Sequence, residues 1–413
     1  MTAEDKMTID ERRKYLQMMK PRYKKATRKE RGQLLDEMET VTGLHRKSLV
    51  RLMKGDLRRK PRRKQRGKKY DVQVTEVLRV IASSLDYPCA ERLTPNLEWM
   101  AKHLASHGEL EMTEQMLLLL RQISISTVER RLAVIRQGQP RVRRRRSRPV
   151  NSILRNVPMG RIPWNVNEAG HFETDLVHHC GQSASGEYVH TLQMVDVASG
   201  WAERRAILGR SYLVMEDAFS VLLELIPFVV LEIHPDNGSE FFNHHLLRFW
   251  EDKVQGIRLS RSRPYHKNDN PFIEQRNADP VRAYLGYDRL DTVAQTRAVN
   301  QLYDKMRLYH NLFQPVMRVQ EKVVVSEPGQ PTRIQRHYDD ARTPFDRLCD
   351  LGALSPESCV QLATLREQTN PRQLLAEIQE QIDHIFSLPG AAPGETQDVY
   401  QTLVIYDRKE NGE

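Results

Sequence analysis

The stretch FVVLEIHPDNGSEF, from Phe228 to Phe241, begins as a buried strand and ends in a polar cluster. Its first half is rich in apolar and β-branched residues, which is typical of a strand covered on both faces. The strand is expected to end at Pro235-Asp236, so the sequence places a carboxylate at the C-terminal end of a buried strand.

The segments on both sides of this stretch predict a mixed α/β region. Three strand-like runs and an amphipathic helix precede it, and a further helix and a short strand follow it. In chain order these segments are HFETDLVHH (171–179), EYVHTLQMVD (187–196), WAERRAIL (201–208), YLVMEDAFSVLLELI (212–226), SEFFNHHLLRFWEDK (239–253) and IRLSRSR (257–263).

Charge is distributed unevenly along the 413 residues. The formal net charge is +10, but residues 1–150 hold 37 lysines and arginines against 18 aspartates and glutamates. The remaining residues hold 27 against 36. A basic excess concentrated in one third of the chain favours nucleic acid, here double-stranded DNA, as the partner.

The composition also indicates a compartment. No apolar run reaches the ~18 residues that a membrane-spanning helix needs, and the first residues, MTAEDKMTIDERRKYL, are too charged for a secretory signal. The four cysteines lack CxxC spacing, which argues against a zinc or disulfide framework. We therefore expect a cytoplasmic protein.

Residues 28–54, RKERGQLLDEMETVTGLHRKSLVRLMK, predict two helices around the turn Thr42-Gly43. A short turn followed by a helix with an exposed basic start is the helix-turn-helix pattern, with Arg46, Lys47 and Arg51 as DNA contacts. An ordinary αα-hairpin is the alternative. The cationic segment RRKPRRKQRGKK (58–69) is expected to be a linker that contacts phosphates.

A second helical unit is expected from about Asp71 to Gln137. In ISISTVERRLAVIR (123–136), Ser126 is a candidate N-cap, Glu129 completes a capping box, and Arg130 and Arg131 point outward. The unit is winged-helix-like or helix-turn-helix-like, and its last helix is expected to face DNA. An arginine cluster follows, with Arg143, Arg144, Arg145 and Arg146 as expected DNA contacts.

Three acidic residues lie where the expected elements end or begin. Asp175 lies within the first strand, Asp236 ends a buried strand, and Glu274 lies one turn into a helix that Asn270 caps and Pro271 begins. Three carboxylates that converge repel one another unless they hold divalent cations, and oxygen ligands favour Mg²⁺ or Mn²⁺. Two such ions, about 4 Å apart, suit phosphodiester chemistry.

In this order the segments FETDLVHH, HPDNGSEF and RPYHKNDNPFIEQRN resemble the DDE transposases and retroviral-type integrases, whose catalytic core is RNase H-like. The resemblance covers roughly residues 160–311. The D-N-G-x-E-F signature is complete, and 37 residues separate Asp236 from Glu274, close to the family's D-x35-E spacing. The resemblance implies that Asp175, Asp236 and Glu274 form the catalytic, metal-holding triad with two Mg²⁺ or Mn²⁺ ions. The Asn-rich KNDN is similar to bacterial insertion-sequence transposases. The resemblance therefore implies a bacterial protein that is associated with the nucleoid when it is bound to DNA.

Other residues near the triad have open roles. Glu173 shares the strand face of Asp175 and is expected either to line the site or to pair with an arginine. His178, Asn237 and Asn277 are candidates for the site lining. The resemblance also implies DNA contacts just before the third carboxylate, at Tyr265, His266, Lys267 and Asn268.

The expected chain is multidomain. Residues 1–69 and 70–150 form N-terminal all-α DNA-binding units, 160–314 an α/β RNase H-like integrase core with a mixed sheet, and 315–413 a small C-terminal β plus helix region. In that last region a β-hairpin is expected around Pro328-Gly329, and a helix with Asn370 as N-cap and Pro371 as its first residue.

The favoured function is an insertion-sequence transposase that binds terminal inverted repeats, cleaves 3′ ends and joins them to target DNA as a DNA-assembled homo-oligomer. Two alternatives stay open. One is a catalytically silent, domesticated transposase that acts as a DNA-binding regulator, and the other is an RNase H-fold nuclease without strand transfer.

Overall fold

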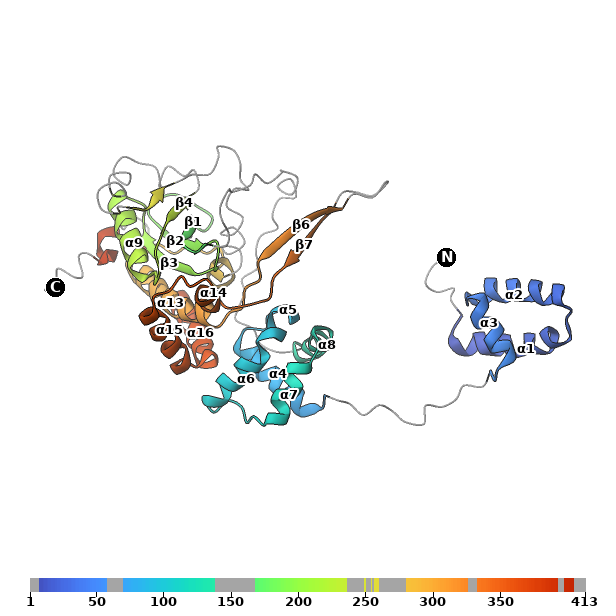
Figure 1. Ribbon diagram of the computed structural model, residues 1–413. Coiled ribbons are helices and arrows are strands. Elements are labelled where there is room, and N and C mark those ends of the chain that lie inside the picture. The colour runs from blue at the N-terminus through green and yellow to red at the C-terminus, as the bar shows by residue number, and fades with distance from the viewer. Residues whose placement is uncertain are drawn as a thin grey trace. The chain divides into compact units, whose positions relative to one another are not determined.

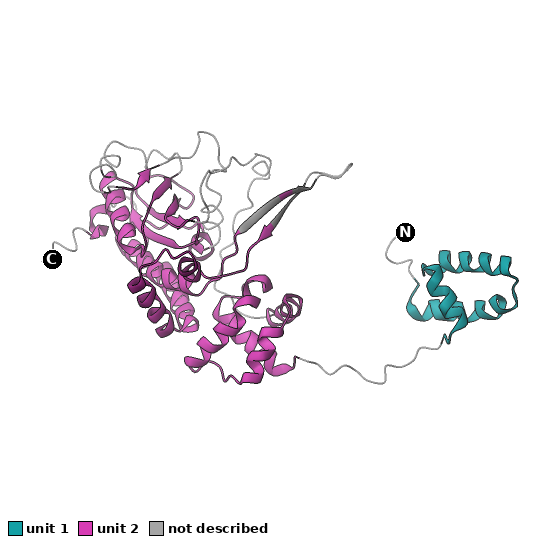
Figure 2. Cartoon of the chain, in the orientation of Figure 1, with its two compact units in different colours: residues 1–69 teal, residues 70–413 magenta. Residues whose placement is uncertain are grey.

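The chain divides into two compact units, residues 1–69 and 70–413 (Figure 2). The computed structural model describes residues 7–57, 70–137, 168–235, 249, 254, 256–259, 280–325, 333–392 and 397–404. The finer division of residues 70–413 into a helical region, a catalytic core and a C-terminal region stays a prediction.

In residues 7–57, the described part of the first unit, three helices surround one small apolar core: α1 (Ile9–Lys25), α2 (Arg28–Thr42) and α3 (Arg46–Lys54). Gly43 ends α2 in the left-handed conformation, with φ of 66°, which glycine adopts without strain. The two helices expected in residues 28–54 are therefore present around the Gly43 turn, and their assignment as a DNA-binding helix-turn-helix stays a prediction. Helix α1 was not expected from the sequence, although Thr8 and Glu11 form a capping box at its start.

The second unit begins with five helices, one of them a single turn. Helix α8 follows Ser124, which has an extended backbone, and the Ser124 carbonyl accepts the first bond of the helix from the Val128 amide at 3.0 Å, so Ser124 is the N-cap. The expected cap at Ser126 with a capping box at Glu129 is therefore wrong, because α8 begins one residue before Ser126 and Ser124 makes no side-chain capping bond. The five helices are α4 (Val72–Ser84), α5 (Ala90–Leu93), α6 (Leu97–Ser106), α7 (Glu114–Gln122) and α8 (Ile125–Ile135).

A five-stranded mixed sheet lies at the centre of the second unit, in the order β3-β2-β1-β4-β5 (Figure 1). The first three strands pair antiparallel, whereas β4 pairs parallel with β1 and β5 parallel with β4. This mixed sheet confirms the α/β texture expected from the sequence. The strands are β1 (His171–His178), β2 (Val189–Asp196), β3 (Ala202–Leu208), β4 (Glu232–Pro235) and β5 (Arg258–Leu259).

Alternating side chains give the sheet two apolar faces, each covered by helices. Phe172, Leu192 and Ile233 share one cluster with helix α9 (Tyr212–Leu225). Val189 and Ala206 belong to a second cluster with three other helices. These helices are α12 (Arg282–Leu285), α13 (Val293–Leu312) and α16 (Pro371–Ser387).

Helix α13 also closes the free edge of strand β3. Asn311 accepts a hydrogen bond from the Ala202 amide at 3.0 Å and donates one to the Ala202 carbonyl at 3.1 Å. Asn300 does the same for Ala206, at 2.7 and 3.0 Å. An unpaired strand edge can pair with another chain, and these two amides satisfy part of that edge internally.

The rest of the second unit packs back onto its first helices. Apolar residues of α14 and α15 lie in one cluster with α4–α8 and the end of α13. The expected hairpin is confirmed by the antiparallel pairing of β6 and β7, and the expected start of α16 by the Asn370 cap and Pro371. These elements are β6 (Val319–Val325), β7 (Arg333–Tyr338), α14 (Pro344–Asp350), α15 (Pro356–Gln368) and a 3₁₀ turn, η6 (Val399–Thr402).

Candidate functional site

Asp175 lies in the middle of β1, which runs between the antiparallel strand β2 and the parallel strand β4. Its side chain is half-buried, and its register partner on β2 is Gln193. On the other side, Thr174 is paired with Pro235, the last residue of β4. The two other residues expected in the triad, Asp236 and Glu274, lie outside the described residues.

A polar row crosses the sheet from Asp175. Gln193 faces Asp175 on β1 and Arg204 on β3, so the three side chains occupy one face of three neighbouring strands. The Nε of Arg204 donates a hydrogen bond to the Oε1 of Gln193 at 3.1 Å. Both side chains are buried, and burial lowers the pKa of Arg204.

The orientation of the Gln193 amide follows from this contact. Its Oε1 is turned toward the guanidinium on β3, so its Nε2 is on the side away from that donor. That Nε2 is buried and has no hydrogen-bond partner among the residues that the structure describes. Because an unpaired buried donor is costly, the amide is suited to donate to an acceptor beside β1.

Arg282, at the start of α12, brings positive charge to the same end of the sheet. Its guanidinium donates to the carbonyls of His178, at 2.7 Å, and Gly286, at 3.0 Å, and stacks over the Tyr287 ring. Burial lowers the pKa of Arg282, and nearby groups, Tyr287 first and Asp175 among them, oppose this shift. Arg282 therefore acts on Asp175 electrostatically while its own donors are engaged elsewhere.

A cluster of uncharged polar side chains lies next to Asp175 and Gln193 on the same face of the sheet. The Nε2 of His179 is 2.8 Å from the hydroxyl of Thr191, which also contacts the hydroxyl of Tyr303 on α13. Burial lowers the pKa of His179 to about 3 and raises the pKa of Tyr303 to about 12. Both side chains are therefore uncharged at neutral pH.

Glu173 and His178 have other surroundings than Asp175. Glu173 is fully buried, and its charge acts on Arg318, whose pKa burial lowers to about 10. His178 is paired with His190 across β1 and β2, and their rings are 4.8 Å apart. The period of two puts His178 on the face opposite to Asp175. Asp196 ends β2 and accepts two hydrogen bonds from Ser199 at 2.6 Å.

Three of the five described residues expected to contact DNA are exposed and two are engaged internally. Lys47, Arg51 and Arg130 are exposed. Arg46 forms an ion pair with Asp36 of its own unit and donates to the Gly32 carbonyl. The expected outward position of Arg131 is wrong, because its guanidinium donates to the Tyr70 carbonyl at 2.6 Å, to the Asp71 carbonyl at 3.2 Å and to the Thr75 hydroxyl.

The remaining expected DNA contacts, and the site-lining candidates Asn237 and Asn277, lie outside the described residues. These DNA contacts are Tyr265, His266, Lys267, Asn268, Arg143, Arg144, Arg145 and Arg146.

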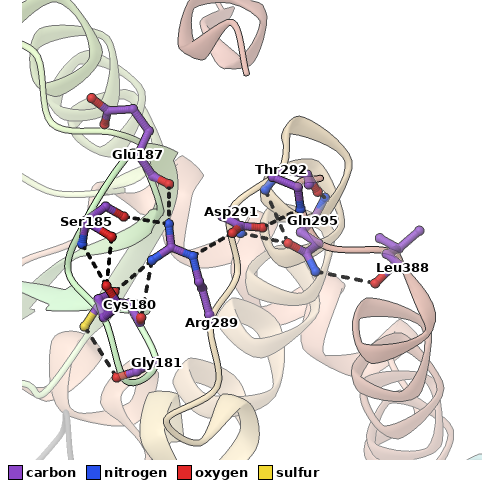
Figure 3. A network of polar contacts seen from close by, with 11 residues as sticks. Cys180, Gly181, Ser185, Glu187, Arg289, Asp291, Thr292, Gln295 and Leu388 are labelled. Carbon is purple, nitrogen blue, oxygen red and sulfur yellow. Dashed lines mark hydrogen bonds and ion pairs between the residues drawn. The ribbon is translucent and has the colours of Figure 1, made fainter. Parts of the chain in front are cut away.

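The loop between β1 and β2 is held by a single arginine, which the sequence did not single out (Figure 3). Arg289 donates to the carbonyls of Ser183, at 2.8 Å, and Ser185, at 2.9 Å, and forms an ion pair with Asp291 at 2.6 Å. Asp291 in turn accepts a hydrogen bond from the Ala391 amide at 2.8 Å. This network ties the loop that follows Asp175 to the segments before α13 and after α16.

Among the described residues, no group of three or more His, Cys, Asp or Glu side chains is arranged to hold a metal ion. No helix in the described ranges is long and apolar enough to cross a membrane.

No protein-family model matches the sequence. A relative in Sinorhizobium fredii, the uncharacterized protein y4rM, is 32% identical over 327 residues, which are 79% of this chain and 91% of that protein. Among solved structures, the catalytic core domain of BIV integrase is similar at 20% identity over 27% of this chain, with a TM-score of 0.22. A chain of the simian T-cell lymphotropic virus intasome, in complex with PP2A regulatory subunit B56 gamma, is similar at 15% identity over 42% of this chain, with a TM-score of 0.25. The matched regions span 66% and 57% of those two chains.

Proposed function

We propose that this chain, which belongs to the same family as y4rM of Sinorhizobium fredii, is a DNA transposase of the integrase-core type. It would bind the terminal inverted repeats of an insertion sequence, cleave the DNA at the 3′ ends and join those ends to target DNA. Asp175, Asp236 and Glu274 would form its catalytic triad.

The parallel pairing of β1 with β4 carries the proposal. Thr174 lies opposite Pro235, and the next residues in the two chain segments are Asp175 and Asp236. Continued by one residue, this pairing would bring two carboxylates to one face of neighbouring strands, whose backbones are about 5 Å apart. Two carboxylates at that separation repel each other unless cations lie between them.

The proposed donor set fits magnesium or manganese. All three side chains supply hard carboxylate oxygens, which these ions prefer, and Asp175 is the one whose surroundings are described. A bound pair of such ions supplies activation of the attacking oxygen and stabilisation of the leaving oxygen in an in-line displacement at phosphorus.

Three residues of this chain would prepare Asp175 for that task. Arg204 orients the Gln193 amide, and Gln193 has a buried Nε2 on the side away from Arg204. A donor there would hold the Asp175 carboxylate in one rotamer. Arg282 favours the ionised carboxylate through space, because its guanidinium is bound to the carbonyls of His178 and Gly286.

The N-terminal unit would bind the element's ends. Residues 1–150 carry most of the positive charge, and Lys47 and Arg51 are exposed on α3, the second helix of the helix–turn–helix. A helix in this position enters the major groove in proteins with this motif. Because two ends must be joined to one target, the active species would be a homo-oligomer assembled on DNA.

Product analysis tests the proposal. The purified full chain is incubated with Mg²⁺ or Mn²⁺ and a labelled duplex that carries the inverted repeat from the DNA flanking the coding region. Joined strands longer than the substrate are expected. Cut ends without joined strands would indicate a nuclease instead, and tight binding without cleavage under either metal would indicate a silent regulator.

A further inference from the structure

Two cysteines on neighbouring helices of the C-terminal region face each other. Cys349 lies in the last turn of α14 and Cys359 in the first turns of α15. Their Sγ atoms are 3.5 Å apart, which is van der Waals contact without a covalent bond. Cys349 is exposed and Cys359 half-buried, so small solutes reach at least one of the two sulfurs.

The helices that carry these cysteines are fixed by packing on both sides. Leu348, next to Cys349, and Leu362, one turn after Cys359, are buried in the cluster that α4–α8 share. Arg366 on α15 forms an ion pair with Asp346 on α14 at 2.6 Å. Its guanidinium also stacks 4.4 Å from the ring centre of Trp99 on α6. The two thiols are therefore held together by the fold.

The turn between the helices is short and well defined. Gly352 has a φ of 62°, and Ser355 caps α15 by accepting a hydrogen bond from the Ser358 amide at 3.1 Å. A disulfide requires the two sulfurs to approach to about 2 Å. From the observed 3.5 Å the two sulfurs would have to approach by about 1.5 Å, and both lie on side chains with a rotatable Cα–Cβ bond.

We propose that Cys349 and Cys359 are a redox-responsive dithiol that closes to an intramolecular disulfide when it meets a small-molecule disulfide oxidant. One protein thiolate attacks a sulfur of the oxidant, whose S–S bond breaks and releases one small thiol. The second protein thiolate then attacks the mixed disulfide, forms the Cys349–Cys359 bond and releases the second small thiol. The two cysteines lose two electrons and two protons, and the small disulfide gains them.

The reaction is expected to be slow at neutral pH. Burial and the contact with Cys359 raise the pKa of Cys349 to about 12. Since the thiolate is the attacking species, the rate of closure should rise as the pH is raised from 7 to 9. The other two cysteines, Cys89 and Cys180, have no cysteine partner among the described residues and serve as internal controls.

Peptide mass spectrometry on the full chain tests the proposal. Oxidised glutathione is added, free thiols are then blocked with N-ethylmaleimide, and the protein is digested with trypsin. Both cysteines fall in one tryptic peptide, Leu348–Arg366, because no lysine or arginine lies between its ends. We expect this peptide to lose two hydrogens and to carry no maleimide. After reduction with dithiothreitol and a second addition of N-ethylmaleimide, it should carry two maleimide groups.

Two variants make the outcome specific. The double variant Cys89→Ser/Cys180→Ser should form the Cys349–Cys359 disulfide as the wild type does. In Cys349→Ser, Cys359 should be found as a glutathione adduct or a free thiol. The proposal is overturned if both cysteines of the folded wild-type chain stay open to maleimide at pH 9, or if each carries its own glutathione. Because the readout is the peptide mass, neither result depends on whether the chain is a transposase.

Discussion

Asp175 on β1 lies directly opposite Gln193 on β2, and Gln193 accepts a hydrogen bond from Arg204 on β3. The proposed catalytic carboxylate is thus the first member of a row that crosses three strands. The three residues of the row come from strands that follow one another along the chain, β1, β2 and β3. The sheet therefore supports Asp175 from the side opposite to β4.

The row predicts a cost for removing the Gln193 amide. In Gln193→Leu the buried Arg204 guanidinium loses its acceptor, so the free energy of unfolding should fall by about 2 kcal/mol. Loss of a supporting residue beside a metal-binding carboxylate typically lowers activity 10- to 100-fold, and we expect strand transfer to fall by roughly that factor. Urea unfolding and the joining assay measure the two effects. Gln373→Leu, at an exposed position on α16, is the matched control and should change neither.

The closed edge of β3 predicts a difference between two asparagines. Asn311→Leu leaves the buried amide and carbonyl of Ala202 without partners, which should lower the free energy of unfolding by about 3 kcal/mol. Asn300 is half-buried, so water can replace its amide at Ala206, and Asn300→Leu should cost about 1 kcal/mol. Equal losses in urea unfolding would contradict the edge-closing role of Asn311.

The buried residue His190 predicts that the folded chain loses stability as the pH falls. Burial first, then the nearby charges of His178 and Arg210, lower the pKa of His190 to about 3. The unfolded chain takes up a proton at this residue near pH 6.5, while the folded chain does not until about pH 3. Stability from this group is therefore complete above pH 6.5 and is lost as the pH falls toward 3.

Substitution of His190 should remove this dependence. Between pH 7 and pH 5, His190 accounts for a loss of about 2 kcal/mol in the free energy of unfolding. His190→Phe keeps the ring packing against Tyr188 and should show a loss smaller by that amount. An identical pH profile for wild type and His190→Phe in urea unfolding would refute the assignment, and the exposed residue His384 supplies the control His384→Gln.

The exposed face of α3 predicts a salt-dependent effect on DNA binding. Lys47→Ala and Arg51→Ala should each weaken binding to any duplex and reduce the slope of log affinity against log salt by about 1. Fluorescence anisotropy with a labelled duplex at several salt concentrations measures both quantities. Lys14→Ala, at an exposed position on α1, is the control; the same loss there would show that binding follows net charge and not α3.

The sequence predicted the elements whose pattern is local. The alternation in HFETDLVHH and EYVHTLQMVD is confirmed by β1 and β2, and the cap at Asn370 is confirmed because its signal lies within three residues. The N-cap of α8 is Ser124 and not the predicted Ser126. Both serines in ISIST are residues favoured at an N-cap, so the local sequence does not distinguish them.

Contacts between distant residues were not predictable from one sequence. Arg131 and Tyr70 are 61 positions apart, and no local pattern distinguishes this arginine from the exposed Arg130 beside it. The same holds for the contact of Asn311 with Ala202, because it depends on how α13 packs against the edge of β3. The site residues Asp236 and Glu274 remain predictions of the sequence pattern.

The most direct measurement of the central claim is strand transfer by the isosteric variants Asp175→Asn and Asp236→Asn. Both are assayed with the end-bearing duplex in Mg²⁺ and in Mn²⁺, beside wild type and the exposed control Asp383→Asn. If the two aspartates hold the catalytic cations, both variants lose cleavage and joining while thermal unfolding and duplex binding stay at the wild-type level, and the control keeps full activity. Undiminished joining by folded Asp175→Asn or Asp236→Asn protein would contradict the claim.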